Sequence, residues 1–150
     1  MAGKALLALL LLGLGAAALA ADAVPVTGHW LSESGNGIIA IARCGTELCG
    51  KIVWLKEPMR DGAPAVDRRN PDPALRTRPI CGLTILGGFR DTEPGRWSDG
   101  WIYSPENGKT YRATLALDAD GTLKLRGYVG IPLFGETQIW TRADPTLHSC

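Results

Sequence analysis

Apolar and polar side chains alternate strictly along the second half of the chain. Tyr111, Ala113 and Leu115 are separated by single polar residues, and so are Leu123 and Leu125. A period of two is typical of antiparallel strands that have one buried face and one face in water. The pattern therefore predicts β-strands here, and it predicts that these five side chains face the core.

Short runs of β-type residues recur along the rest of the chain, separated by Gly, Asn, Asp and Pro. The runs cover residues 27–33, 37–43, 50–55, 83–90, 96–104, 109–117, 122–129 and 136–142. Most of the connections are short enough to be hairpin turns, and about eight strands suffice to close a meander into a barrel. We predict an all-β fold with a single small antiparallel up-and-down β-barrel, and a two-sheet sandwich is the alternative.

One long connection interrupts this pattern. Residues 56–79 hold five of the ten prolines, together with six basic and four acidic residues. A connection of this length within a compact domain is usually either disordered or functional. Asn70 followed by Pro71 is typical of a helix start, with Asn70 as the N-cap. We expect one short helical turn that lies over one end of the barrel.

The first twenty residues resemble an export signal. Lys4 precedes an apolar run, and Ala18-Leu19-Ala20 fits the small-residue rule for signal-peptide cleavage. The apolar run is too short for a membrane anchor. We predict a signal peptide at 1–20, a barrel domain at 21–142 and a C-terminal tail at 143–150. The mature protein is then exported to the periplasm or the extracellular space, with no stable membrane insertion after cleavage.

The charge of the chain argues against some classes of partner. The formal net charge is +1 with Lys4 counted, and therefore zero without the leader. Proteins that bind nucleic acids need a surplus of Lys and Arg to neutralise phosphates. We therefore expect no nucleic-acid partner, and the sequence identifies no protein partner.

All four cysteines follow the predicted leader, which suits an oxidising compartment. Cys44 and Cys49 flank a turn-like segment, so we predict a disulfide across a hairpin. Cys81 could pair with Cys150, but Cys150 is the last residue and chain ends are often loose, so this second pairing stays open. No Cys-x-x-Cys occurs and the chain has two histidines, so we expect no metal site.

Several blocks of the sequence form a distinctive set. They are Cys44-Gly45, Leu48 to Leu55, Asn70 to Arg76, Arg78 to Leu83, Gly108 to Tyr111, Gly127 to Gly135 and Thr137 to Arg142. Over roughly residues 28–142 the chain resembles a family of short exported bacterial proteins described only as a domain of unknown function. The resemblance implies a calycin-type barrel, the architecture of lipocalins and avidins, and implies neither a reaction nor a ligand.

A smaller motif points to the same architecture. Gly28-His29-Trp30 is similar to the Gly-x-Trp motif on the first strand of lipocalins, and Arg142 ends the last predicted strand. In a closed barrel these two strands are neighbours. We therefore expect Arg142 to stack on the Trp30 ring in a structural role, a contact that contributes about 0.5–2 kcal/mol.

Common catalytic motifs are absent from the sequence. There is no Gly-x-Ser-x-Gly, no His-Glu-x-x-His, no Walker loop and no dinucleotide fingerprint, and we expect no cofactor. Among the acidic residues of the long connection, Asp67 is the one to test as a general base, with Asp72 as a second carboxylate. A hydrolase or isomerase that uses these carboxylates is one functional hypothesis, without a catalytic assignment.

Aromatic residues on most of the predicted strands support a second hypothesis, ligand binding. They fill the core in most proteins, but some could line a pocket. Polar residues of the long connection could line its mouth, with an Arg that binds a carboxylate or phosphate, although capping and solvated charge are the usual roles. The candidate ligand-binding residues are Trp54, Trp101, Tyr103, Tyr111, Tyr128, Asp67, Asn70, Arg76 and Arg78.

The preferred hypothesis is therefore a periplasmic binding module. It would hold a small amphiphilic or apolar ligand inside the barrel, beneath the long connection. The alternatives are a cell-envelope scaffold that binds another protein and the hydrolase or isomerase described above.

Overall fold

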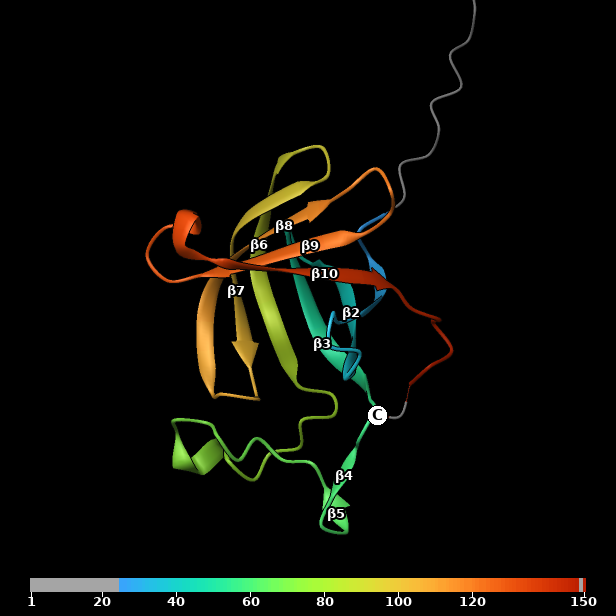
Figure 1. Ribbon diagram of the computed structural model, residues 1–150, viewed down its shortest axis with the longest axis vertical. Helices are drawn as coiled ribbons and strands as arrows, with labels where there is room; N and C mark the ends of the chain where they lie inside the picture. Colours follow the sequence, from blue (N-terminus) through green and yellow to red (C-terminus); the bar gives the residue numbers. More distant parts are fainter. Residues whose placement is uncertain (1–24, 149) are drawn as a thin grey trace, which may run out of the picture.

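A closed antiparallel β-barrel dominates the structure of this protein, a computed structural model that describes residues 25–148 and Cys150 (Figure 1). Each strand of the wall pairs with the next wall strand along the chain, β3 with β6 across the long connection, and β1 pairs with both β2 and β10. The wall consists of β1 (Gly28–Leu31), β2 (Gly37–Cys44), β3 (Glu47–Leu55), β6 (Thr84–Glu93), β7 (Arg96–Ser104), β8 (Lys109–Leu117), β9 (Leu123–Tyr128) and β10 (Glu136–Arg142). This topology confirms the predicted up-and-down barrel over a sandwich.

The strand boundaries agree with the predicted runs to within two residues, except at two ends. β3 begins at Glu47, three residues before the predicted run at 50, because Cys44 pairs directly with Glu47 and leaves a turn of only Gly45 and Thr46. Gly45 has φ +67°, a conformation that glycine adopts without a steric penalty. β6 continues to Glu93, where it pairs with Arg96.

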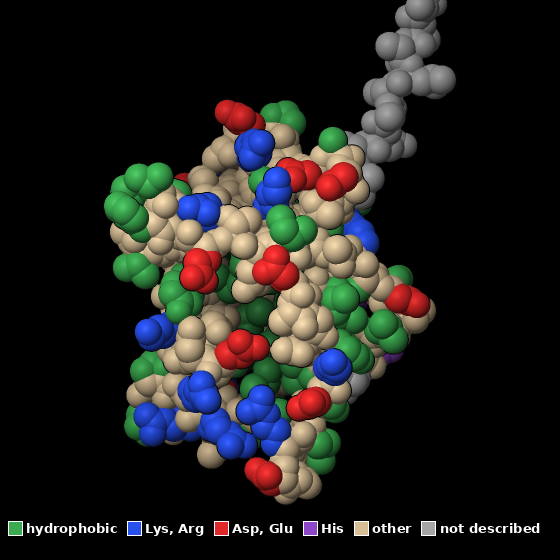
Figure 2. Space-filling model, in the orientation of Figure 1, with side chains coloured by type: hydrophobic (Ala, Val, Ile, Leu, Met, Phe, Trp, Pro, Cys, Tyr) green, Lys and Arg blue, Asp and Glu red, His purple; other side chains and the backbone are tan. Residues whose placement is uncertain are grey.

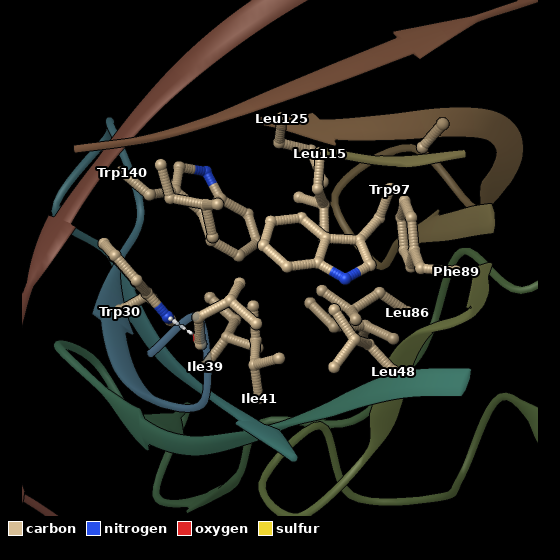
Figure 3. Packing of buried hydrophobic residues seen from close by; sticks show 14 of the residues in the cluster. Trp30, Ile39, Ile41, Leu48, Leu86, Phe89, Trp97, Leu115, Leu125 and Trp140 are labelled. Carbon is tan, nitrogen blue, oxygen red and sulfur yellow. Dashed lines mark hydrogen bonds between the residues drawn. The ribbon is translucent and has the colours of Figure 1, made fainter. Parts of the chain in front are cut away.

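Large side chains from opposite walls fill the barrel interior (Figure 3). Ala113, Leu115, Leu123 and Leu125 are buried in this core, as the alternation predicted, whereas Tyr111 is only partly buried and lies outside the core cluster. Gly100 provides space for one of the rings, because a Cβ atom at this position would lie 2.3 Å from Phe89 Cδ1. The labelled core residues are Trp30, Ile39, Ile41, Leu48, Leu86, Phe89, Trp97, Leu115, Leu125 and Trp140.

The contact between the first and last strands is formed as predicted. Trp30 is paired with Arg142, and the guanidinium carbon of Arg142 lies 3.9 Å from the centroid of the Trp30 ring. The indole Nε1 donates to the Val26 carbonyl at 2.8 Å, and Arg142 Nη1 donates to the Thr27 carbonyl at 2.8 Å. Together these bonds connect the chain before β1 to the last strand.

Both pairs of cysteines are disulfide-bonded, Cys44 with Cys49 and Cys81 with Cys150. The second bond settles the pairing that the sequence left open. It returns the C-terminal tail to the barrel, where the Cys150 amide donates to the Val53 carbonyl at 3.2 Å. Both bonds suit an oxidising compartment.

Replacement of the hairpin disulfide should measurably destabilise the barrel. The bond closes a short loop, since the two cysteines are five positions apart. In the chain-entropy model, Cys44→Ser combined with Cys49→Ser lowers the free energy of unfolding by about 2 kcal/mol. Urea denaturation of the oxidised protein and of the double variant measures this difference. Equal stabilities, or free thiols at both positions in protein isolated without reductant, would refute the prediction.

The long connection between β3 and β6 contains short elements that the sequence analysis did not predict. Met59–Arg60 (β4) and Ala63–Pro64 (β5) form a small hairpin. The expected helical turn is a 3₁₀ turn, η1 (Pro73–Leu75), and a second one, η2 (Pro132–Phe134), lies between β9 and β10.

The predicted cap of the helical turn is wrong. Asp72 and not Asn70 is the N-cap, because the Asp72 side chain accepts a hydrogen bond from the Ala74 amide at 2.9 Å. Asn70 is held instead by tertiary contacts. Its amide donates to Asp67 and Tyr103, and its side-chain oxygen accepts from the Asp72 amide.

The predicted signal peptide at 1–20 lies outside the described residues. Within the part of the chain that is described, no helix has the length and apolar character needed to cross a membrane.

Candidate functional site

The long connection folds back on itself below the barrel, at the bottom of Figure 1. Two hydrogen bonds join its beginning to its end, from the Asp67 amide to the Arg78 carbonyl at 3.0 Å and from the Ile80 amide to the Ala65 carbonyl at 2.9 Å. Val66 and Pro79 form a β-bridge between them. Residues 68–77 therefore form a loop with a closed base, and this loop carries η1.

This loop packs against the β7–β8 hairpin. Arg69 Nη1 donates to the Glu106 carbonyl at 2.6 Å. At Gly108 the two backbones approach so closely that a Cβ atom would lie 1.9 Å from the Arg69 carbonyl oxygen. Gly108 also has φ +72°, so any other residue would be strained and would displace the loop.

A buried carboxylate lies at the centre of this contact. Asp67 has no exposed surface. Its Oδ1 accepts from the Tyr103 hydroxyl at 2.6 Å, and its Oδ2 accepts from Asn70 Nδ2 and Arg78 Nε at 2.9 Å each. Arg78 Nη2 also lies 2.9 Å from Oδ2, which completes an ion pair. Among the described residues, no buried polar side-chain atom lacks a hydrogen-bond partner.

These contacts keep Asp67 ionised. Burial by itself raises the pKa of Asp67, but the hydrogen bonds from Tyr103, Asn70 and Arg78 and the charge of Arg78 outweigh it, so the pKa lies below its ordinary value. The pKa of Tyr103 is raised by burial and by its bond to Asp67. A carboxylate with a lowered pKa and with donors on both oxygens is a poor general base at neutral pH. The geometry gives Asp67 the role of orienting Arg78.

A cleft of about 260 Å³ lies beside this network. It is lined by Asn70, Pro71, Arg78, Thr84, Trp101, Tyr103 and Thr110. Its wall is the outer face of the barrel. Ala113 faces the core, so Thr110 and Arg112, which are exposed, point outward; their cross-strand partners Tyr103 and Trp101 point the same way. The long connection forms the opposite side.

Trp101 presents an apolar surface to this cleft. Its side chain is 38% exposed. The indole lies over two glycines of β6, since a Cβ atom at Gly87 would be 3.0 Å from Trp101 Cζ2 and one at Gly88 would be 3.4 Å from Cδ1. Any larger residue at Gly87 would push the ring away. The glycines thus let the ring lie flat on the wall, with its other face open.

Positive charge gathers around the same end of the molecule. Figure 2 shows Lys and Arg side chains over the region that the long connection occupies in Figure 1. Arg76 is fixed by a bond from its Nε to the Asn70 carbonyl at 2.8 Å, and Arg112 is the cross-strand neighbour of Trp101. An apolar ring beside oriented guanidinium groups suits a ligand that combines an anionic group with a flat or apolar body.

The predicted ligand-binding residues fall into three groups. Asn70, Arg78, Trp101 and Tyr103 line the cleft, whereas Asp67 and Arg76 support its rim. The others lie elsewhere: Trp54 lines a different surface groove with Leu31, Ile38 and Leu147, Tyr111 accepts a hydrogen bond from Asn107, and Tyr128 is buried with Arg112 5.9 Å from its ring.

Sequence reasoning missed Pro71, Thr84 and Thr110 as cleft residues. The register Tyr103↔Thr110 brings Thr110 to the site, and the pairing of β3 with β6 places Thr84 opposite Lys51. The turn sequence Pro105 to Gly108 could have indicated the first pairing. The second pairing contains bulges, which sequence alone does not locate.

The expected position of a ligand inside the barrel is not the one that the geometry favours. Buried side chains from both walls meet in the interior (Figure 3). Three of the five tryptophans, Trp30, Trp97 and Trp140, belong to that core. The cleft described above lies on the outer wall instead.

The fold is shared with a solved structure. Protein HP1028 from the human pathogen Helicobacter pylori, which is described as belonging to the lipocalin family, is similar with a TM-score of 0.72 over 81% of this chain and 85% of that chain. The two sequences are 20% identical, so the likeness concerns the fold alone. No curated protein matches the sequence.

A protein-family model matches residues 28–142, which span the whole barrel. Its members are described as uncharacterized proteins conserved in bacteria (DUF2147). With its closed lipocalin-like barrel, this chain belongs to the DUF2147 family.

Proposed function

We propose that this protein is an exported binding module that holds a small anionic ligand with a flat or apolar body in the cleft between the long connection and the outer wall of β7 and β8. The observation that carries the proposal is the placement of Arg78. The fully buried Asp67 fixes the Arg78 guanidinium at the edge of a cleft whose wall carries the half-exposed Trp101 ring.

The chemistry of the ligand follows from these groups. Asp67 engages Arg78 Nε and Nη2, so Nη1 is the nitrogen that a ligand carboxylate or phosphate would reach. Trp101 would stack against the apolar body, and Thr84 and Thr110 offer hydroxyl groups. Because the Arg is held before the ligand arrives, little side-chain entropy is lost on binding.

Export is part of the proposal. The leader pattern at 1–20 is what a secreted protein needs, and two disulfides persist most readily outside the cytoplasm. In a Gram-negative cell the periplasm is the corresponding compartment. Expression of the full chain, followed by fractionation and N-terminal sequencing, tests cleavage after Ala20.

The binding site can be tested with the anionic aromatic dye anilinonaphthalene sulfonate. Wild-type protein should enhance its fluorescence, and aliphatic or aromatic carboxylates and phosphomonoesters should displace it. Trp101→Ala should weaken dye binding about tenfold, as expected for the loss of a central aromatic contact. Raising the salt concentration should also weaken dye binding, because salt screens the attraction between the guanidinium groups at the cleft and the sulfonate of the dye.

Trp54→Ala is the matched control, because Trp54 is a partly buried Trp that lines the other groove. It should leave dye binding unchanged. If Trp54→Ala abolishes binding and Trp101→Ala does not, the cleft is not the site. Absence of saturable binding by the wild type, together with absence of copurified ligand in native mass spectrometry, would refute the proposed function.

A further inference from the structure

An exposed apolar loop connects β9 and β10. We call residues 129–135 the apolar tip. Val129, Ile131, Leu133 and Phe134 are between 52% and 77% exposed. Figure 2 shows a group of hydrophobic side chains projecting at the side where Figure 1 places this connection, far from the long connection at the bottom. Exposed apolar patches of this kind usually mark an interaction surface.

The shape of the apolar tip is held by its own hydrogen bonds. Arg126 donates from Nε to the Pro132 carbonyl at 2.6 Å, from Nη2 to the Leu133 carbonyl at 3.3 Å and from Nη1 to Thr137 Oγ1 at 2.8 Å. The Phe134 and Gly135 amides bond to the Ile131 and Pro132 carbonyls within η2. The apolar side chains are thus directed outward by a braced backbone.

This bracing matters for transfer into an apolar medium. A peptide group that leaves water without a partner is strongly penalised, and in lipid every such group must be satisfied within the protein. In the apolar tip the carbonyls of Ile131, Pro132 and Leu133 already accept hydrogen bonds. Burial of the tip would therefore gain apolar contact without leaving these carbonyls unpaired.

The size and charge of the tip favour a lipid surface as the occupant. A standard protein interface takes about 20–30 residues from each side, whereas the tip is a projecting loop of seven residues. A bilayer accepts such a convex projection without a matching groove. By register, Arg126 and Arg112 lie at the base of the tip beside Gly127 and Tyr128, with Glu136 as the acidic neighbour. Arg126 braces the tip with all three of its side-chain nitrogens, and the exposed Arg112 lies over the Tyr128 ring. Their positive charge at the base of the tip would attract lipid phosphates while the apolar side chains enter the acyl region.

We propose that the apolar tip inserts into the interfacial layer of a lipid bilayer and docks the barrel on a membrane surface. The contact is peripheral, made by Val129, Ile131, Leu133 and Phe134. These four apolar side chains lie outside the cleft between the long connection and β7–β8, so the contact does not depend on the proposed ligand.

Co-flotation with phospholipid vesicles tests this proposal. The exported protein should float with phosphatidylcholine vesicles, and more so when phosphatidylglycerol is included. Leu133→Ser combined with Phe134→Ser should lower the bound fraction at least about tenfold, because two exposed apolar side chains no longer enter the lipid. Met59→Ser combined with Leu147→Ser is the matched control, because these residues are exposed but lie outside the tip. It should float like the wild type.

A second measurement reports the tip itself. Phe134→Trp places an indole on the tip, and brominated lipids should quench this added emission. Circular dichroism checks that all variants keep the barrel. Failure of the wild type to float would overturn the proposal, and so would flotation that the double substitution leaves unchanged. Dimerisation abolished by the same substitution, without vesicle binding, would instead assign the tip to a second copy of the chain.

Discussion

Trp30→Ala should lower the free energy of unfolding by about 3–5 kcal/mol, the usual range for removing a large buried ring. Trp30 is completely buried and packs within the barrel core. The substitution leaves a cavity and eliminates the hydrogen bond to the Val26 carbonyl. It also leaves Arg142 without the ring on which it stacks. Urea denaturation followed by circular dichroism measures the change.

Two further variants, Arg142→Ala and Trp54→Ala, show which contacts of Trp30 account for the loss of stability. Arg142→Ala should remove only the stacking and the bonds to the chain before β1, with a loss of about 0.5–2 kcal/mol. Trp54→Ala removes an indole that lies on the outer wall, outside the core cluster, and should cost clearly less than Trp30→Ala. If Trp30→Ala and Trp54→Ala were equally stable, Trp30 would not be the residue that closes this end of the barrel.

Asp67→Ala should also destabilise the protein by about 3–5 kcal/mol, the usual effect of removing one member of a buried ion pair. The substitution leaves the Tyr103 hydroxyl, the Asn70 amide and the Arg78 guanidinium without their shared acceptor. The long connection should then detach from the β7–β8 hairpin. Denaturation measures the stability, and limited proteolysis within residues 56–80 measures the detachment.

The same carboxylate predicts a pH dependence. The pKa of Asp67 is lower in the folded protein than the ordinary value of 3.8. Its contribution to stability is therefore fully present above that ordinary value and is lost as the pH falls through the lower, folded pKa. Asp67→Asn should flatten the acid limb of the stability curve below pH 3.8.

The matched control for this series is Asp72→Ala. Asp72 is an exposed carboxylate of the same loop, and it caps η1 through the Ala74 amide. Loss of an N-cap costs about 1 kcal/mol. A loss at Asp72 as large as at Asp67, or no loss at Asp67, would show that the buried network does not hold the loop.

The hydrogen bonds of Asp67 and Asp72 bear on the hydrolase or isomerase hypothesis. Both oxygens of Asp67 are occupied by donors, and Asp72 uses its side chain to cap η1. The donors on both of its oxygens leave Asp67 poorly arranged to accept a proton from a substrate. Asp67 instead holds the Arg78 guanidinium in place. Arg78 and Trp101 are the groups that a ligand would contact.

Local signals determined much of the fold. Alternation along residues 109–117 and 122–129 identified the strands and their buried faces, because strand period and turn chemistry depend on neighbours in sequence. The pairing of Cys44 with Cys49 followed from the turn between them, and the contact of Trp30 with Arg142 followed once barrel closure was assumed. In both cases the partners are neighbours in the chain or lie on strands that closure brings together.

Several features depended on tertiary structure. Asn70 has the sequence properties of an N-cap, but its side-chain amide donates to the buried Asp67 and to Tyr103 on β7, a partner that is distant in the sequence. The bond between Cys81 and Cys150 required the path of the C-terminal tail.

The sequence by itself determined that this protein is an all-β meander of about eight strands, because strand period, turns and apolar alternation are local properties. The structure decided for a closed barrel over a sandwich. Only the tertiary structure decided that aromatic side chains fill the interior and that the cleft lies on the outer wall. The physical reason is that the facing of Trp101 and Tyr103 depends on strand register, and register here is shifted by a bulge in β7 between Trp97 and Gly100.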